Sequence, residues 1–204
     1  MKSEILHLLR HADGYVSGQQ LCETFGVSRT AVWKVINQLK EEGYVIDSVQ
    51  NKGYRITEYP DIITASEIES LLLDDSGNMQ GICRHIQYFD KTDSTNNQAK
   101  LAAEKNAPEG TLFVAECQTG GRGRRGKTWE SPAGSGIWMS LLLRPDISPE
   151  SASMLTLVLA VAMVDAINEE VQDAKCYVKW PNDIVLNNRK ISGTLTEMSA
   201  EMDS

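Results

Sequence analysis

The sequence lacks the cysteine spacing of a zinc knuckle, a CxxC redox pair or a dense disulfide framework. Its four cysteines lie far apart along the chain, at Cys22, Cys83, Cys117 and Cys176. We interpret them as buried free thiols of a cytosolic protein. The three histidines have no cysteine or carboxylate partner at metal-ligand spacing. No metal site built from protein side chains is therefore predicted.

Long apolar segments are missing as well. No run of about 18 uncharged apolar residues is present. The longest apolar stretch, residues 154–164, contains Thr156 and is followed by Asp165. At the N-terminus, Glu4 and His7 fall where a signal peptide has its apolar core. We therefore expect a cytoplasmic protein with no membrane-spanning helix and no membrane partner.

The sequence has fewer basic than acidic residues. The chain has 20 Lys and Arg against 28 Asp and Glu, a net charge of −8, which argues against a globally basic nucleic-acid binder. Residues 1–57 hold seven basic and six acidic side chains, whereas residues 58–204 hold thirteen and twenty-two. The first segment is the less acidic one, which is a weak indication of DNA binding.

The first 58 residues predict three helices and a hairpin. Apolar residues at helical spacing, serines at N-cap positions and glycines at the turns delimit the helices. Two short alternating runs around Asn51-Lys52-Gly53 predict the hairpin. The expected helices span residues 5–9, 17–25 and 28–42, and the strands span 44–46 and 54–56. This order is typical of a winged helix-turn-helix.

The third of these helices is the expected DNA-recognition helix. Its N-terminal side chains are donor-rich and suit base edges and phosphates of the major groove, and the wing tip adds a cation. The predicted DNA-binding residues are Ser17, Ser28, Arg29, Thr30, Lys34 and Lys52. A solvated polar face or a protein-binding winged helix are the alternatives. Specific binding would require a dimer on a palindrome, because one module covers a half-site.

The rest of the chain predicts an α+β domain with a mixed sheet. We expect a winged helix over residues 1–58, a linker and connecting helix over 59–83 and a second domain over 84–204. Trp138 and Trp180 are expected to pack in its core. Its predicted strands span 84–89, 112–117, 137–143, 176–180, 184–186 and 190–197, and its helices span 95–106 and 148–168, the latter capped by Ser148.

The densest chemical signal is the segment G-G-R-G-R-R-G-K at residues 120–127. Glycines allow left-handed backbone and close approach, and successive amides with guanidiniums can hold an anion. The spacing is neither a Walker A motif nor a dinucleotide fingerprint. From the residues alone, nucleotide or anion binding, RNA binding and a solvated linker all stay open.

Four motifs of the second domain resemble the signature of biotin–protein ligases. They are C-Q-T-G-G-R-G-R-R-G-K-T-W-E-S-P-A-G at 117–134, D-S-T-N at 93–96, K-W-P-N-D-I at 179–184 and R-K-I-S-G at 189–193. The V-S-R-T-A-V-W-K run at 27–34 is similar to biotin-operon repressors. Together they resemble the family of bifunctional biotin–protein ligases and repressors, whose catalytic domain has a class II aminoacyl-tRNA synthetase-like fold.

The resemblance implies an activity and its partners. Biotin would be activated with ATP, as its magnesium complex, to biotinoyl-5′-AMP, and then transferred to a lysine of biotin carboxyl carrier protein. Bound biotinoyl-AMP would favour a homodimer that represses biotin biosynthesis genes at operator DNA. The family continues through further strands and a small SH3-like barrel, so we expect a chain truncated at its C-terminus. The alternative is a ligand-sensing repressor that has lost ligation through truncation.

The resemblance also implies roles for individual residues. The expected catalytic cations are Lys190 and Arg124. The expected biotin-binding residues are Ser94, Thr95, Asn96, Gln118, Gly121, Arg122, Arg124, Lys190 and Gly193. The expected nucleotide-binding residues are Arg124, Arg125, Trp129, Lys179 and Asn182. Asp183 is a weaker candidate for magnesium. Thr194 departs from the family, which has an aliphatic residue there.

Overall fold

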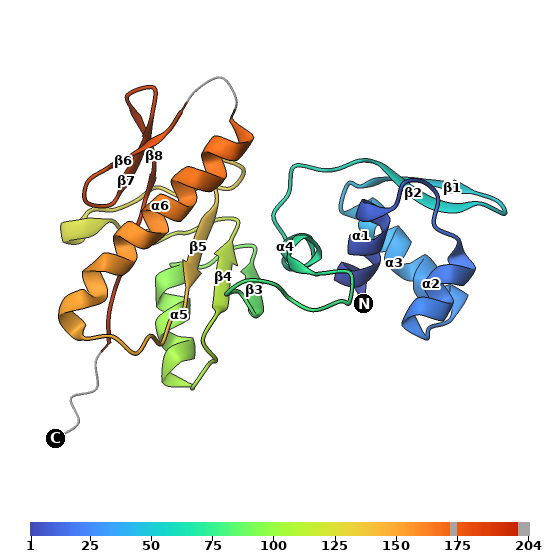
Figure 1. Ribbon diagram of the computed structural model, residues 1–204, viewed down its shortest axis with the longest axis horizontal. Coiled ribbons are helices and arrows are strands. Elements are labelled where there is room, and N and C mark those ends of the chain that lie inside the picture. The colour runs from blue at the N-terminus through green and yellow to red at the C-terminus, as the bar shows by residue number, and fades with distance from the viewer. Residues whose placement is uncertain (172–174, 200–204) are drawn as a thin grey trace.

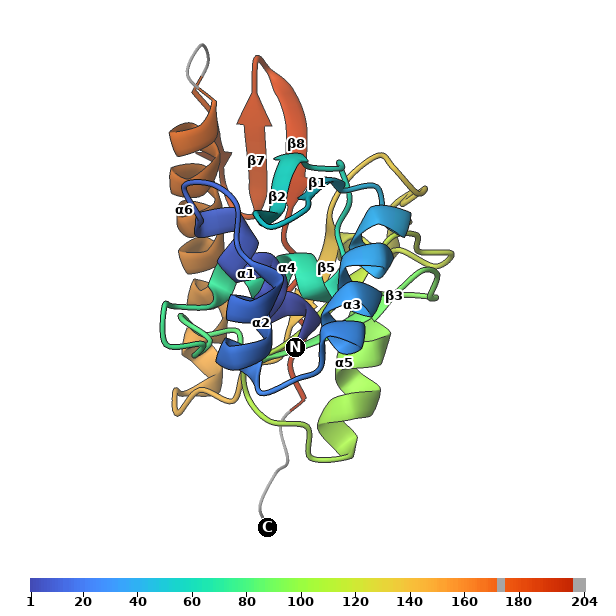
Figure 2. The ribbon, with the colours of Figure 1, turned by 90° about the vertical axis from the view of Figure 1, so that its right-hand side faces the viewer.

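The computed structural model describes residues 1–171 and 175–199. Figure 1 shows two bodies, a winged helix at the N-terminal end and a mixed α/β part that carries the rest of the chain, with α4 between them. Figure 2, seen from the winged-helix end, shows its helices in front of β5, α5 and α6. The predicted fold class, a winged helix followed by a mixed α+β domain, is confirmed.

The N-terminal body contains α1 (Lys2–His11), α2 (Gly18–Phe25), α3 (Arg29–Glu41), β1 (Val45–Val49) and β2 (Gly53–Glu58). The Ser17 and Ser28 hydroxyls cap α2 and α3 by accepting from Gln20 N and Ala31 N, as predicted. The two strands pair antiparallel. Apolar side chains of all five elements form one core, which contains Ile5, Leu6, Leu9, Leu21, Val32, Ile36, Leu39, Ile46 and Ile56.

The connecting helix α4 (Ala65–Leu72) begins at Thr64, whose hydroxyl caps the helix at Glu67 N, 3.1 Å away. It packs against α1 on one side and β3 on the other. The side chains of Arg10 and Glu67 are only 18% and 15% exposed, and they form an ion pair of 2.6 Å. The Tyr44 hydroxyl donates to the same carboxylate, and the Arg10 guanidinium lies 4.6 Å from the centre of the Tyr59 ring. Polar contacts thus hold the connecting segment to the winged helix.

The second body begins with the mixed sheet β3 (His85–Phe89), β4 (Thr111–Ala115) and β5 (Trp138–Leu141). β3 runs parallel to β4, and β5 runs antiparallel to it. Every residue of β4 is buried, as expected for the central strand of a sheet covered by a helix. That helix is α5 (Thr95–Glu104), which packs on β4 and β5.

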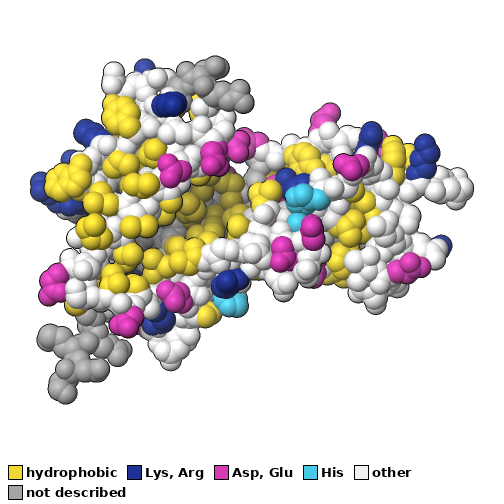
Figure 3. All heavy atoms as spheres, viewed as in Figure 1, with side chains coloured by type: hydrophobic (Ala, Val, Ile, Leu, Met, Phe, Trp, Pro, Cys, Tyr) yellow, Lys and Arg dark blue, Asp and Glu magenta, His cyan; other side chains and the backbone are white. Residues whose placement is uncertain are grey.

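The chain continues through a 3₁₀ turn, η2 (Pro149–Ser151), and α6 (Ala152–Glu170) to the antiparallel sheet β6 (Tyr177–Lys179), β7 (Asp183–Leu186) and β8 (Arg189–Gly193). α6 contacts β6 and β7. Ala160 is its one buried residue, and Met154, Val158 and Val161 are more than half exposed. Figure 3 shows apolar side chains gathered along this helix and around a hollow beside it.

One segment is long and apolar enough to span a membrane by length and composition, while the expectation of no membrane-spanning helix stays a prediction. Residues Pro149–Glu170 form one helical segment of 22 residues that meets the criteria of length and composition. The core helix of a soluble protein can meet the same criteria. Asp165 and Thr156 interrupt the sequence pattern but are too few to make the segment polar on average.

Three local expectations also differ from the structure. Ser148 makes no side-chain cap, because the first turn is a separate 3₁₀ turn. The last strand ends at Gly193, not at Glu197. Trp180 is 77% exposed rather than in the core, because it directly precedes the turn between β6 and β7, while Trp138 is partly buried as a strand residue.

Candidate functional site

The first part of the site is a set of hydroxyl and amide side chains at the start of α5. Ser94 and Thr95 are each 3% exposed. The Gln118 carbonyl accepts from the Thr95 backbone amide at 2.8 Å and its hydroxyl at 3.1 Å, and its amide donates to the Ser131 hydroxyl at 3.0 Å. The Thr95 hydroxyl lies 2.7 Å from that of Ser140. The structure therefore brings Thr95 and Gln118 together, as predicted.

Ser131 and Ser140 belong to this network but were missed by the sequence analysis. Ser131 is 2% exposed, and Ser140 donates to the side-chain carbonyl of Asn96. Each had a signal in the sequence. Ser131 lies within the quoted motif, and Ser140 interrupts the apolar run of β5.

Residues 120–127 form a tight loop of backbone hydrogen bonds. The Trp129 amide donates to the Gly121 carbonyl at 2.8 Å, and the Gly123 amide donates to the Lys127 carbonyl at 2.7 Å. A Cβ at Gly121 would lie 2.3 Å from the Trp129 carbonyl oxygen, so only glycine fits there. The loop contains the turn η1 (Arg124–Gly126), in which Arg125 has a left-handed φ of 58°.

Arg122 extends from this loop toward α5. Its guanidinium donates to the Asn97 carbonyl at 2.5 Å and lies 3.3 Å from a carboxylate oxygen of Glu197. Glu197 also accepts from Asn96 at 2.8 Å and Lys100 at 3.0 Å. Burial acts to raise the pKa of Glu197, but the hydrogen bonds from Asn96 and Lys100 outweigh it and hold this pKa below its usual value.

Lys190 and Trp129, predicted for biotin and adenine respectively, lie together. The Lys190 ammonium is 2.6 Å from a carboxylate oxygen of Asp183 and 4.8 Å from the centre of the Trp129 ring. A Cβ on Gly193 would come within 2.8 Å of the same ammonium. Gly193 therefore leaves room for Lys190, which is held by a carboxylate and an aromatic face.

Arg124 lies beside a cavity of about 480 Å³. Its guanidinium donates to the Asn182 carbonyl at 3.0 Å, and the Asn182 amide donates to the Thr194 carbonyl at 3.0 Å. α6 and the segment after β8 line the other walls, and Trp180 lies at the rim. Arg124 and Asn182, both expected to bind the nucleotide, are thus in contact.

The segment 193–197 joins the two halves of the site. Gly193 accommodates Lys190, Thr194 is bonded to Asn182, and Glu197 is bonded to Asn96 and Arg122. Within residues 1–171 and 175–199, Arg125 and Lys179 make no side-chain hydrogen bond or ion pair with the other predicted residues. Lys179 does pair with Asp183 across the β6–β7 ladder.

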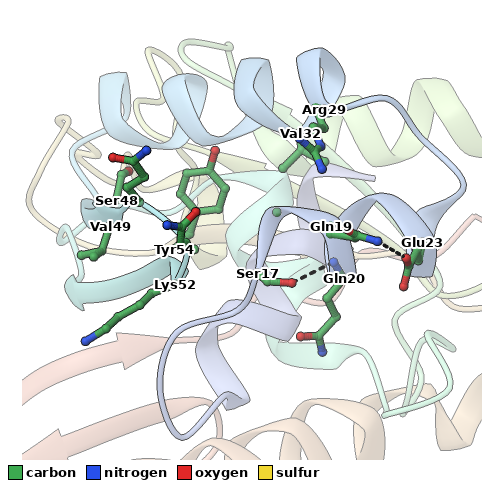
Figure 4. Close-up of a pocket in the computed structure, with 14 residues that line it drawn as sticks. Ser17, Gln19, Gln20, Glu23, Arg29, Val32, Ser48, Val49, Lys52 and Tyr54 are labelled. Carbon is green, nitrogen blue, oxygen red and sulfur yellow. Dashed lines mark hydrogen bonds between the residues drawn. The ribbon is translucent and has the colours of Figure 1, made fainter.

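The second candidate site is a groove on the winged helix, of about 660 Å³. Figure 4 shows Ser17 and Gln20 at the start of α2, Arg29 at the start of α3, and Lys52 on the wing. Thr30 and Lys34 are exposed on α3. Four of the six predicted DNA-binding residues, Ser28, Arg29, Thr30 and Lys34, therefore lie at or near the start of one helix.

Metal ligands do not gather at either site. Among the residues that the structure describes, no group of three or more His, Cys, Asp or Glu could hold an ion. Asp183 has one carboxylate oxygen paired with Lys190. The donor set around Asp183 therefore does not fit a magnesium site built from protein ligands.

Comparisons with known proteins show the family of each part of the chain. Residues 88–203 match the model of the biotin/lipoate A/B protein ligase family, and residues 2–55 match an HTH domain. The bifunctional ligase/repressor BirA of Bacillus subtilis is 44% identical over 204 residues, which are 100% of this chain and 61% of that protein. BirA of Escherichia coli is 34% identical over 198 residues, 97% of this chain and 58% of that protein.

A solved structure is similar as well. The biotin protein ligase of Aquifex aeolicus in complex with biotin and ATP has a TM-score of 0.50 and 37% identity, and the match covers 56% of this chain and 47% of that one. The chain spans about three fifths of the length of the curated relatives it matches. It belongs to the biotin/lipoate A/B protein ligase family and carries an HTH domain at its N-terminus.

Proposed function

We propose that the chain activates biotin with ATP to biotinoyl-5′-AMP and transfers it to a lysine of a biotin carboxyl carrier protein. Residues 84–204 would carry this chemistry, residues 1–58 would bind operator DNA, and residues 59–83 would connect them in a cytoplasmic protein. The observation that carries the proposal is the segment 193–197, which joins the amide and hydroxyl set to the cations Arg122, Arg124 and Lys190.

The amide and hydroxyl set suits the ureido ring of biotin, which offers two N–H donors and one carbonyl acceptor. Thr95 and Gln118 hold each other in place through the hydrogen bonds between them. Ser94, Asn96, Gly121 and Gly193 would complete the slot. The mutual bonds fix the orientation of these side chains before a ligand arrives, so that binding would require little reordering.

The cations suit the adenylation step. A biotin carboxylate oxygen attacks the α-phosphorus of ATP, an acyl–phosphate bond forms, and pyrophosphate leaves. Two anions must come together in this step. Positive charge at the reacting centre is therefore the main way to stabilise the transition state. Lys190 and Arg124 would stabilise the negative charge of the reacting oxygens, and Arg122 would bind the biotin carboxylate. Arg125, Trp129, Lys179 and Asn182 would contact the nucleotide.

The transfer step consumes the biotinoyl-5′-AMP formed in the first step, a mixed anhydride of biotin and AMP. The amine of the carrier lysine attacks the biotinoyl carbonyl, the bond to AMP breaks, and AMP leaves as the new amide loses its proton. Magnesium would enter as a component of the nucleotide substrate. No residue is proposed as its ligand, because Lys190 already neutralises Asp183.

Substitution of the two cations tests this proposal. Lys190→Ala and Arg124→Ala should each slow biotin-dependent exchange of pyrophosphate into ATP by roughly 10²–10³-fold, the usual effect of losing one group that stabilises developing charge. Arg189→Ala removes an equal charge from the exposed position next to Lys190 and should change the rate less than twofold. Equal rates for all three variants would contradict the assignment.

The repressor half of the proposal needs a dimer, since one winged helix covers one half-site. Biotinoyl-AMP bound at the site would favour dimerisation and so operator binding. The full chain, biotin, ATP and a carrier domain are incubated, and carrier mass and DNA binding are both followed. Ligand-dependent DNA binding without a change in carrier mass would indicate a sensor that has no ligase activity.

A further inference from the structure

Trp33 is an exposed aromatic side chain on the outer face of α3, and neither proposed activity has used it. Its side chain is 57% exposed. The helix buries Val32, Val35, Ile36 and Leu39 in the core of the winged helix. Trp33 lies outside this buried stripe, next to exposed polar and basic residues of the same helix.

The helical spacing places Trp33 among the proposed DNA contacts. It follows Arg29 by four residues and Thr30 by three, and residues at these intervals are neighbours on one face of a helix. Lys34 is the next residue and is exposed as well. If Arg29, Thr30 and Lys34 contact the duplex, Trp33 faces the same major groove as these residues.

The chemistry around Trp33 favours nucleic acid over an apolar protein surface. Arg29 and Lys34 are exposed cations close to Trp33 along the helix, and an apolar partner that covered this part of α3 would have to desolvate both. In the major groove, by contrast, these cations would bind phosphate oxygens or the acceptors of guanine, which compensates for the water that they lose. The apolar feature that the major groove offers is the 5-methyl group of thymine.

We propose that Trp33 packs against a thymine methyl group in each operator half-site and thereby contributes to sequence specificity. The inference rests on the proposed DNA binding and names one of its base contacts. The indole supplies a wide apolar surface with two side-chain torsions, so that little conformational freedom is lost on contact. Arg29, Thr30 and Lys34 supply hydrogen-bond donors around it.

The experiment removes the methyl group from the DNA and the indole from the protein. Duplexes are first selected from a random pool with the full chain and biotinoyl-AMP. Each thymine of the selected half-site is then replaced by deoxyuridine, and affinity is measured at fixed salt. Loss of one buried methyl group should weaken binding about fourfold per half-site, at one thymine position.

The Trp33→Ala variant should bind the selected duplex at least tenfold more weakly and should show no further loss at that deoxyuridine position. Leu71→Ala is the matched control, because Leu71 is also 57% exposed and lies on α4. It should keep both the affinity and the deoxyuridine effect. Thermal unfolding of each variant checks that the fold is retained.

The two proposals fail in different ways. If no duplex is selected, DNA binding itself is wrong, and this inference falls with it. If a duplex is selected but no deoxyuridine position weakens the native chain, or if Trp33→Ala keeps the same deoxyuridine loss, the thymine contact is wrong while DNA binding stands.

Discussion

At the scale of single residues, the candidate site balances its cations with carboxylates of the same domain. Lys190 pairs with Asp183 and Arg122 with Glu197. A ligand carboxylate or phosphate would compete for the same ammonium and guanidinium groups. Because these pairs are between a fifth and two fifths exposed, their exchange for a ligand costs little compared with a fully buried pair.

The Asp93 carboxylate gives a prediction for pH. A hydrogen bond from Asn97 and one from the Ser94 amide lower its pKa from 3.8 to about 2. Because the folded pKa lies below the unfolded one, the contribution to stability is present above about pH 4 and is lost as the pH falls toward 2. Asn97→Ala should raise the pKa of Asp93 toward 3.8, measured by NMR titration of the carboxyl carbon.

The control for this prediction is Gln98→Ala, because the Gln98 bond to Asp93 at 3.2 Å contributes less to the shift. It should move the pKa of Asp93 less than Asn97→Ala does. An Asp93 pKa that stays near 2 in the Asn97 variant would show that another group holds the carboxylate in its charged form.

At the scale of elements, the position of the wing depends on Gly53, the first residue of β2. Gly53 has a φ of +116°, and a Cβ there would lie 2.0 Å from the Val16 carbonyl oxygen. Val16 and Tyr54 exchange two backbone hydrogen bonds of 2.9 Å at this point. The wing can therefore pair with the segment before α2 only if residue 53 has no side chain.

We predict that Gly53→Ala destabilises the winged helix by about 2 kcal/mol or more, from backbone strain and the clash with Val16. Gly14→Ala is the matched control, since a Cβ at Gly14 would have no neighbouring atom within 4 Å. Hydrogen exchange at the Val16 and Tyr54 amides measures the effect. Equal protection in both variants would mean that the wing shifts to accept the side chain.

At the scale of the whole molecule, α4 links the two bodies. It is bonded to the winged helix through Glu67 and packs on β3 at the edge of the mixed sheet. Burial and the hydrogen bond to Glu67 raise the pKa of the Tyr44 hydroxyl. One carboxylate of α4 thus holds both Arg10 and Tyr44 of the winged helix.

We predict that Glu67→Gln destabilises the chain by about 2 kcal/mol, because it leaves the partly buried Arg10 charge without a counterion. The pKa of Tyr44 should fall, because the hydrogen bond and the negative charge of Glu67 no longer raise it, while burial continues to do so. Urea unfolding and ultraviolet titration of tyrosine measure the two effects. Glu69→Gln on the same helix is the control, since Glu69 forms no ion pair among the described residues.

The sequence by itself determined the local elements and the family. Ser17 and Ser28 cap the helices that they were predicted to cap, because capping and apolar periodicity depend on residues a few positions apart. The four motifs indicated a ligase through their resemblance to biotin–protein ligases. The glycine and arginine content of the loop at residues 120–127 left RNA binding and a solvated linker open as well.

Only the tertiary structure decided which groups meet. The contacts of Glu197 with Asn96 and Arg122 join residues about 75 to 101 positions apart, and no local pattern encodes such a pairing. The exposure of Trp180 and of α6 was decided in the same way, because burial depends on what packs against a segment. Composition sets how apolar a helix is, whereas its neighbours in space set how much of it is covered.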